Sequence, residues 1–202
     1  MPSPWERLTP NDIAFLNGKL FDKYRLDDVN QPWKHGTFSR VFQIGNRHLL
    51  RLSCATNRDG QEILHNAKII DNLMETIDLL PFVTSRTYHI MPESNMMIIE
   101  SILDEIDDIV PIEEWPDVFQ TPANLLFALL EAGNELQSHG IIQRDISHNN
   151  TLLRRSSRKF VFIDADDACV PLQNIPMCRK PITGTPGFCL VEFDTGDTAL
   201  TN

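Results

Sequence analysis

The chain has 202 residues, 42% of them hydrophobic and 23% charged, which is ordinary for one globular domain or two small lobes. Its formal net charge of −10 argues against a nucleic-acid surface, because phosphate contacts need clustered Lys and Arg. The first residues lack the features of a signal peptide, and no stretch approaches the ~18 apolar residues of a membrane span. We therefore expect a soluble intracellular protein, in the cytoplasm or nucleus, with no nucleic-acid or membrane partner.

The cysteines are isolated from one another, and no CxxC pair occurs among Cys54, Cys169, Cys178 and Cys189. In an intracellular protein such residues are expected as reduced thiols, so no disulfides are expected. The sequence also has no internal repeat and no low-complexity tract.

The first half of the chain predicts strands around a single long helix. Residues 1–30 show short helical signals after a cap at Thr9. Residues 37–52 are typical of two strands joined at Gly45-Asn46. A helix is expected from about 59 to 75, entered through Asp59-Gly60, because its apolar residues follow helical spacing. A second strand pair is expected at 87–89 and 96–102.

The segment 103–120 is acidic and is expected to form a solvated loop. Its carboxylates are Asp104, Glu105, Asp107, Asp108, Glu113, Glu114 and Asp117. The alternative is a site that attracts a basic substrate peptide.

A helix and a hairpin are expected after this loop. Thr121 suits an N-cap, Pro122 the first helical position and Gly140 the C-terminal cap. One apolar face is predicted from Leu125, Leu126, Leu129, Leu130 and Leu136. The apolar runs 151–153 and 160–164, separated by a polar turn, predict the hairpin.

Three side chains with oxygen ligands flank this hairpin. Asp145 and Asn150 precede its first strand, and Asp164 ends its second. Two carboxylates and a carboxamide that converge suit a hard ion such as Mg²⁺ together with substrate phosphates. A carboxylate held slightly apart from the metal ligands can accept a proton from an attacking hydroxyl.

Four motifs in chain order resemble those of protein kinases. The sequence QRDISHNN is similar to the catalytic loop HRD-x4-N, and FVFIDAD is similar to the strand that ends in the DFG aspartate. The sequence KHGTFSRV at 34–41 resembles the glycine-rich loop, and TGTPGFCLVE at 183–192 resembles the end of an activation segment. The combination is most similar to the fungal-specific protein kinase family.

The resemblance implies ATP- and Mg²⁺-dependent phosphoryl transfer to Ser or Thr of an unknown protein substrate. Asp145 would be the catalytic base, and Asn150 and Asp164 would bind the metal. Arg51 stands where kinases place a lysine that contacts the α and β phosphates, and Glu62 is its expected partner.

The resemblance also implies which residues bind the nucleotide. Backbone amides of the loop would cover the phosphates, and this loop comprises Gly36, Thr37, Phe38 and Ser39. Val41 and Leu152 would sandwich the adenine, and Ile99 would close the back of its pocket. Backbone groups of Glu100 and Ile102 would bond the adenine edge.

The implied fold is an α+β, bilobal, protein-kinase-like fold with a β-rich N-lobe containing one helix. Its expected segments are an N-terminal extension (1–30), an N-lobe (31–102), an acidic linker (103–120) and a mainly helical C-lobe (121–202). The helices of a full kinase do not follow Glu192, so the C-lobe is expected to be truncated and incomplete.

Several positions depart from the kinase pattern. Lys34 and Ser39 replace two glycines of the loop, and Arg51 replaces the lysine, exchanging a compact ammonium for a planar fork. Gln143 replaces the histidine of HRD, and Ala165 replaces the DFG phenylalanine. Two alternatives therefore stay open: a pseudokinase that binds nucleotide or partners, and a small-molecule phosphotransferase of the aminoglycoside or choline kinase type.

Overall fold

The computed structural model describes residues 3–26, 28–45, 48–74, 83–104, 109–110, 114–142 and 150–162, with 168 and 170. The chain divides into two compact units. Unit 1 comprises Met1–Leu64 and Phe82–Asp107, and unit 2 comprises His65–Pro81 and Asp108–Asn202. The first 30 residues thus belong to unit 1 together with residues 31–64 and 82–102 of the expected N-lobe, whereas residues 65–81 of that segment belong to unit 2. The predicted lobe boundaries themselves stay a prediction.

Unit 1 begins with the short 3-10 helix η1 (Pro4–Arg7) and the α-helix α1 (Pro10–Tyr24). The predicted cap at Thr9 is confirmed: its hydroxyl accepts from the amide of Asp12, whose carboxylate accepts from the amide of Thr9. This capping box satisfies two amides that the first helical turn leaves unpaired. The helix is longer than the short signals suggested, because Leu16 and Leu20 are buried in the core of unit 1 and stabilise it.

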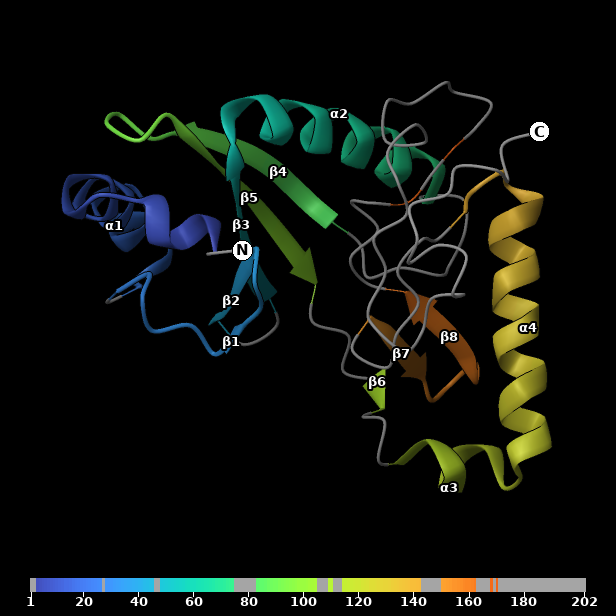
Figure 1. Ribbon diagram of the computed structural model, residues 1–202. Helices are drawn as coiled ribbons and strands as arrows, with labels where there is room; N and C mark the ends of the chain where they lie inside the picture. Colours follow the sequence, from blue (N-terminus) through green and yellow to red (C-terminus); the bar gives the residue numbers. More distant parts are fainter. Residues whose placement is uncertain are drawn as a thin grey trace. The chain divides into compact units, whose positions relative to one another are not determined.

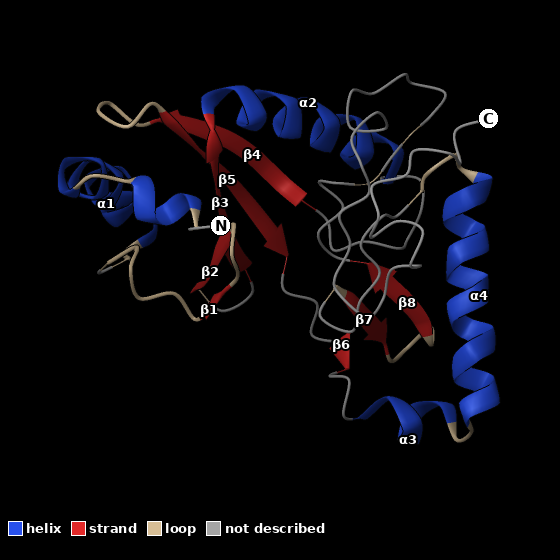
Figure 2. Cartoon of the chain, in the orientation of Figure 1, coloured by secondary structure: helices blue, strands red, loops and turns tan. Residues whose placement is uncertain are grey.

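The centre of unit 1 is a five-stranded antiparallel sheet (Figures 1 and 2). Its order is β1 (Lys34–His35), β2 (Ser39–Ile44), β3 (His48–Thr56), β5 (Met96–Asp104) and β4 (Val83–Ile90). The two predicted strand pairs are confirmed. However, β4 begins four residues earlier than expected, because Ser85 and Arg86 continue the ladder with β5. Gly45, at the β2–β3 turn, has a φ of 60°, which glycine adopts without strain.

The two faces of this sheet are covered by different helices. Leu50, Leu52 and Ile98 point to one face and pack with Leu16 and Leu20 of α1. On the other face, Met97 and Ile99 pack against Leu64 of the helix α2 (Asn57–Met74). A strand alternates its side chains between faces, so neighbouring residues of β3 and β5 meet different helices.

Helix α2 confirms the predicted helix but begins two residues earlier, at Asn57. Gly60 therefore lies inside the helix and not at its entrance. A Cβ added at Gly60 would lie 2.6 Å from the sulfur and 2.9 Å from Cβ of Met97. The glycine thus allows a close approach of α2 to β5.

Unit 2 contains the short strand β6 (Ile109–Val110), the helices α3 (Trp115–Phe119) and α4 (Pro122–Ser138), and the hairpin β7 (Thr151–Arg154) and β8 (Lys159–Phe162). The acidic segment is therefore not a simple loop, because β6 pairs with β7 and α3 buries Trp115 and Phe119. Trp115 and Phe119 lie among the carboxylates, and their burial stabilises the described part of this segment.

Helix α4 starts and ends as predicted. The Thr121 hydroxyl accepts from the amide of Asn124, and Gly140 has a φ of 72° after the helix. The predicted apolar face is only half right. Leu125, Leu129 and Leu136 pack on the core, whereas Leu126 and Leu130 are 57% and 54% exposed.

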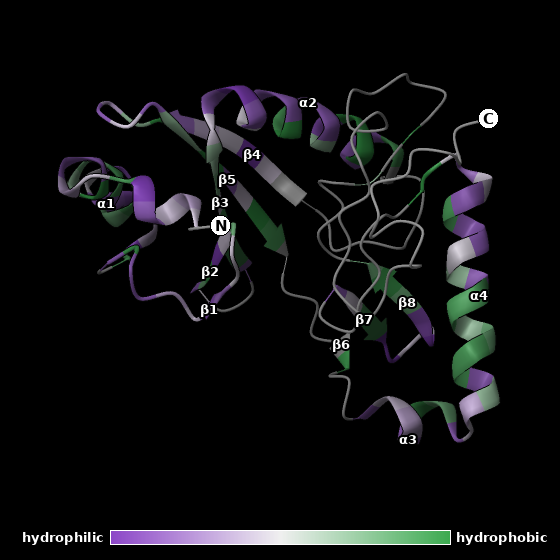
Figure 3. Cartoon of the chain, viewed as in Figure 1, coloured by the Kyte–Doolittle hydropathy of each residue, from purple (hydrophilic) through white to green (hydrophobic). Residues whose placement is uncertain are grey.

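The difference in exposure between these leucines follows from the helical period. Positions 125, 129, 132 and 136 are spaced by three or four residues and form one stripe, while 126 and 130 lie one residue further round. Figure 3 shows hydrophobic residues gathered in the half of α4 next to α3. In the described part of the chain, no helix is both long and apolar enough to cross a bilayer.

Phe160 lies at the centre of the core of unit 2. Its ring is fully buried, with the Trp115 ring edge-on at 5.1 Å and the Phe119 ring stacked at 5.6 Å between centroids. The hairpin, α3 and α4 thus pack around one aromatic cluster, whose three rings are all buried.

Candidate functional site

The loop predicted to cover phosphates is a tight turn between β1 and β2. The amide of Gly36 donates to the carbonyl of Ser39 at 2.8 Å, and Phe38 at the tip is 62% exposed. A Cβ added at Gly36 would make only ordinary contact, 3.6 Å from Ser39 Oγ. Within the protein itself, therefore, this turn does not require glycine for steric reasons.

Of the six predicted nucleotide-binding residues on strands of unit 1, the strand register places four on one face of the sheet, namely Ser39, Val41, Arg51 and Ile99. Val41 on β2 lies opposite Arg51 on β3, which lies opposite Ser101 on β5. Two residues along these strands, Ser39 lies opposite Ser53, which lies opposite Ile99. Side chains at paired positions share a face, so Ser39, Val41 and half-buried Arg51 lie on the same side of the sheet as Ile99, which packs against α2.

A second arginine lies in the same row. Arg86 on β4 is paired with Ser101, and its Nη1 donates to Ser101 Oγ at 2.9 Å. Arg51 and Arg86 thus flank one serine on a single sheet face. Sequence reasoning missed Arg86 because it started the strand at Thr87, and the β-branched and aromatic residues before and after Arg86 were the signal that would have extended it.

Glu100 and Ile102 lie on the opposite face of the sheet. Ile102 packs at the edge of the core formed with α1, and Glu100 is 1% exposed. Both are paired to β3 on one side and to β4 on the other. The sheet therefore already engages the backbone groups that were expected to bond an adenine edge, because β5 runs on to Asp104.

The side chain of Glu100 is the centre of a buried polar network. It accepts from Lys23 Nζ at 2.6 Å, from His89 Nε2 at 2.7 Å and from the Tyr24 hydroxyl. Burial alone would raise the pKa of Glu100, but the hydrogen bonds from His89, Lys23 and Tyr24 lower it to about 2. The network ties the end of α1 to the sheet, across a chain separation that no local pattern reveals.

Glu62 is part of α2 and is partly buried. Its carboxylate lies 3.9 Å from Arg58 Nε, one turn earlier on the helix. Its expected pairing with Arg51 stays a prediction.

One turn after Glu62, Asn66 is fully buried and its Nδ2 donates to the carbonyl of Ala168 at 3.1 Å. An apolar residue is expected at this position of a kinase, so a polar contact to the chain after Asp164 stands in its place.

The predicted metal and catalytic residues are only partly described. Asn150 directly precedes β7 and is half-buried, whereas Asp145 and Asp164 lie outside the described residues. Thr151 pairs with Phe162, so Asn150 lies at the open end of the hairpin, where β8 also ends. Leu152 pairs with Val161 and belongs to unit 2, while Val41 belongs to unit 1, so the predicted adenine sandwich stays a prediction.

The predicted metal ligands are all oxygen donors, which suit Mg²⁺. The amide oxygen of Asn150 is a hard ligand of the kind that Mg²⁺ accepts, and Asp145 and Asp164 would add carboxylate oxygens. The described residues contain no group of three or more His, Cys, Asp or Glu side chains arranged to hold a metal.

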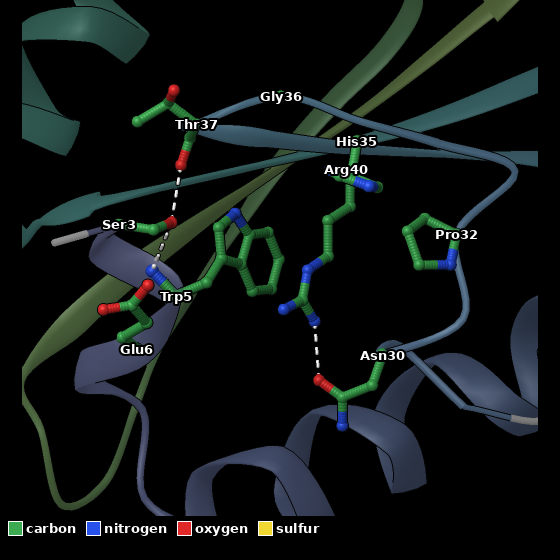
Figure 4. Close-up of a pocket in the computed structure, with 9 residues that line it drawn as sticks. All are labelled: Ser3, Trp5, Glu6, Asn30, Pro32, His35, Gly36, Thr37 and Arg40. Atoms are coloured by element: carbon green, nitrogen blue, oxygen red, sulfur yellow. Dashed lines mark hydrogen bonds between the residues drawn. The ribbon is translucent and has the colours of Figure 1, made fainter.

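A cavity of about 580 Å³ lies beside the turn (Figure 4). Its walls include Ser3, Trp5, Gly36 and Arg40. Glu6 also lines it, and a carboxylate there would repel a phosphate group. Arg40 in the same walls is cationic, so the lining charges oppose one another. The cavity is relevant here for the contacts that Ser3 and Trp5 make with the turn.

No protein-family model matches the sequence, and no curated protein matches it. Among solved structures, the co-crystal structure of WbdD with the kinase inhibitor LY294002 is similar to this chain, with a TM-score of 0.47 and 15% identical residues. The similarity covers 69% of this chain and 33% of that chain, so this chain spans about a third of that protein. The mixed α/β structure, with its five antiparallel strands and several helices, is compatible with a kinase-like bilobal fold.

Proposed function

We propose that the protein catalyses ATP- and Mg²⁺-dependent phosphoryl transfer to Ser or Thr hydroxyls of a protein substrate. The observation that carries the proposal is the sheet register, which sets Ser39, Val41 and Arg51 on one face. A turn of backbone amides next to a cation on a strand is the arrangement that a nucleotide's phosphates require.

Each residue has a role in the proposed reaction. Asp145 accepts the proton of the substrate hydroxyl, and Asn150 and Asp164 hold the metal, which when bound neutralises charge on the phosphate oxygens. Arg51, supported in the same row by Arg86, orients the phosphates, while Ile99 closes the apolar end of the site. In this proposal, residues 31–102 form the N-lobe, 121–202 form the C-lobe and 1–30 are an extension.

Two observations each favour a different alternative function. Arg51 in place of lysine favours a module that binds nucleotide or a partner without transfer, since a planar guanidinium positions a phosphate differently from an ammonium. The short connection between β2, which ends at Ile44, and β3, which begins at His48, favours a small-molecule phosphotransferase of the aminoglycoside or choline kinase type.

The decisive experiment measures nucleotide binding and phosphate transfer separately. Mg-ATP should raise the melting temperature, because a ligand that binds only the native state stabilises it. Labelled phosphate from ATP should reach a generic basic protein, and Asp145→Asn should abolish the transfer while the ATP-induced shift is retained. Transfer only to an amino alcohol or an aminoglycoside would identify the small-molecule enzyme.

Arg51→Met tests the proposed phosphate contact, with Arg155→Met as a matched control. Arg155 is 61% exposed and pairs with Glu114 at the turn of the hairpin, at the other end of β7 from Asn150, so its substitution removes a similar charge. We expect only Arg51→Met to lose the ATP-induced shift. Binding without transfer to any acceptor would favour the binding module. No shift in the wild type would contradict both phosphotransferases and nucleotide binding by the module.

A further inference from the structure

The N-terminal residues of the chain hold the β1–β2 turn directly. Ser3 Oγ donates to the carbonyl of Thr37 at 2.7 Å, and Trp5 Nε1 donates to the carbonyl of Phe38 at 3.1 Å. The two acceptors are consecutive carbonyls of the turn expected to cover phosphates. Figure 4 shows Ser3, the N-cap of η1, bonded to Thr37 of the turn, with Trp5 next to it.

Trp5, which makes one of these two contacts, is held in a fixed position. Trp5 is 6% exposed and belongs to the core of unit 1, on the sheet face that α1 covers. The guanidinium of Arg40 lies over the Trp5 ring, 4.1 Å from its centroid, and Nη1 of Arg40 donates to the Val29 carbonyl at 2.8 Å and to Asn30 Oδ1 at 2.7 Å. A ring packed below and covered by a bonded cation cannot easily change its orientation.

Holding the carbonyls also orients the amides. A peptide group is planar, and in the trans form its C=O and N–H point in opposite directions. The described peptide bonds are trans, so the N–H groups of Phe38 and Ser39 point away from Ser3 and Trp5. The Phe38 carbonyl accepts a second hydrogen bond, from the amide of Cys54 at 2.8 Å, which further limits rotation of that peptide.

This anchoring matters more here than in a loop with three glycines. A glycine-rich loop reaches many conformations and loses that freedom when it closes on a ligand. Here Lys34 and Ser39 occupy two of the glycine positions, and the hydrogen bonds from η1 select one conformation before any ligand binds. The turn is thus less able to change conformation than a glycine-rich loop, but it is already ordered before a ligand binds.

We propose that Ser3 and Trp5 are positioning residues for nucleotide binding, which act by fixing the β1–β2 turn so that its amides face the phosphates. The inference rests on the proposed function, because it assigns the turn to ATP. It makes the N-terminal segment a required part of the site and not merely an addition to the fold.

The test uses the full chain with Ser3→Ala and Trp5→Phe. Trp5→Phe keeps an aromatic ring next to Arg40 and removes the N–H donor. Ser3→Ala removes the hydroxyl that donates to Thr37 and that also accepts from the Trp5 amide as the N-cap of η1. Trp33→Phe is the matched control, since Trp33 is also in unit 1 but is 57% exposed. The readouts are amide hydrogen exchange over residues 36–39 without nucleotide, and the Kd for Mg-ATP by calorimetry.

We expect both variants to exchange faster over the turn and to bind Mg-ATP on the order of fivefold more weakly, as the loss of one neutral hydrogen bond implies. If transfer occurs, KM for ATP should rise while kcat is retained. Trp33→Phe should change neither quantity. Circular dichroism checks folding, and Ser3→Ala keeps the test valid if Trp5→Phe is destabilised.

The outcomes separate the two proposals. Normal ATP binding by both variants, with the wild type also binding, would overturn the positioning role and leave the proposed function standing. Unchanged exchange over the turn would overturn the positioning role in the same way. A wild type that does not bind Mg-ATP would overturn both, whatever the exchange shows.

Discussion

The two compact units hold their cores together by different means. Both buried carboxylates among the described residues, Asp12 and Glu100, lie in unit 1, where they bond partners from other elements. Unit 2 is instead built around the rings of Trp115, Phe119 and Phe160.

Apolar contact is non-directional and sets how much volume is filled, whereas a hydrogen-bonded charge sets which way an element points. Unit 1 carries the turn and Arg51, whose relative orientation matters for the proposed site. The hydrogen-bonded carboxylates therefore lie in the unit whose groups need a fixed relative orientation.

The largest effect is expected from Phe160→Ala, which removes the ring at the centre of unit 2. Truncation of a buried phenylalanine leaves a cavity, and we expect a loss of about 4 kcal/mol in the free energy of unfolding. Urea denaturation followed by circular dichroism measures it, with Phe160→Leu as a milder control. A loss below about 1 kcal/mol would show that the aromatic cluster does not hold this unit together.

The next effect concerns pH and unit 1. The pKa of Glu100 is lowered from 4.5 to about 2 by its hydrogen bonds, so its contribution is complete above the unfolded value and is lost as the pH falls from about 4.5 towards about 2. We expect it to amount to about 3 kcal/mol. Glu100→Gln should be less stable than the wild type at pH 7, and the difference should vanish towards pH 2. A constant difference would contradict the role given to the charge.

Asn66 supplies a neutral polar contact in unit 2 for comparison with Glu100. Asn66→Leu removes the donor to the Ala168 carbonyl while keeping a similar volume, and we expect a loss of about 2 kcal/mol that does not depend on pH. Asn66→Ala adds a cavity and should cost more. Equal stability of Asn66→Leu and the wild type in thermal and urea unfolding would mean that apolar burial replaces the hydrogen bond, as in the rest of that core.

The smallest effect is expected at the helix caps, which have the same chemistry in both units. Thr121→Ala removes one cap bond of α4 and should cost about 1 kcal/mol. Thr9→Ala should cost more, because Thr9 also takes part in a capping box with Asp12 and its hydroxyl donates to Glu93. Thermal unfolding of both variants makes the comparison, and the reverse order would show that the capping box adds nothing.

The sequence predicted the elements whose causes are local. Thr9 and Thr121 cap helices through residues three positions away, Gly45 permits the turn between β2 and β3, and the alternation of apolar residues marks the strands. The limits of these elements were less accurate. The early start of β4 depends on pairing with β5, and the exposure of Leu126 and Leu130 depends on where the core lies.

The residues of the candidate site likewise fall into two groups, those that sequence motifs indicate and those that only the strand register reveals. The resemblance to kinase motifs singled out Gly36, Arg51 and Asn150 as candidates, and their roles stay a prediction. Arg86 was not identified, because its place beside Ser101 follows from strand register and not from any motif.

What the sequence determined by itself is therefore the order of helices, strands and chemical groups, since these follow from propensities and spacings within a few residues. Only the tertiary structure decided that Lys23 reaches Glu100 across 77 positions, and that Trp5 holds the turn at Phe38 across 33. The physical reason is that a hydrogen bond between distant residues exists only once packing has brought them together, and packing depends on the whole core.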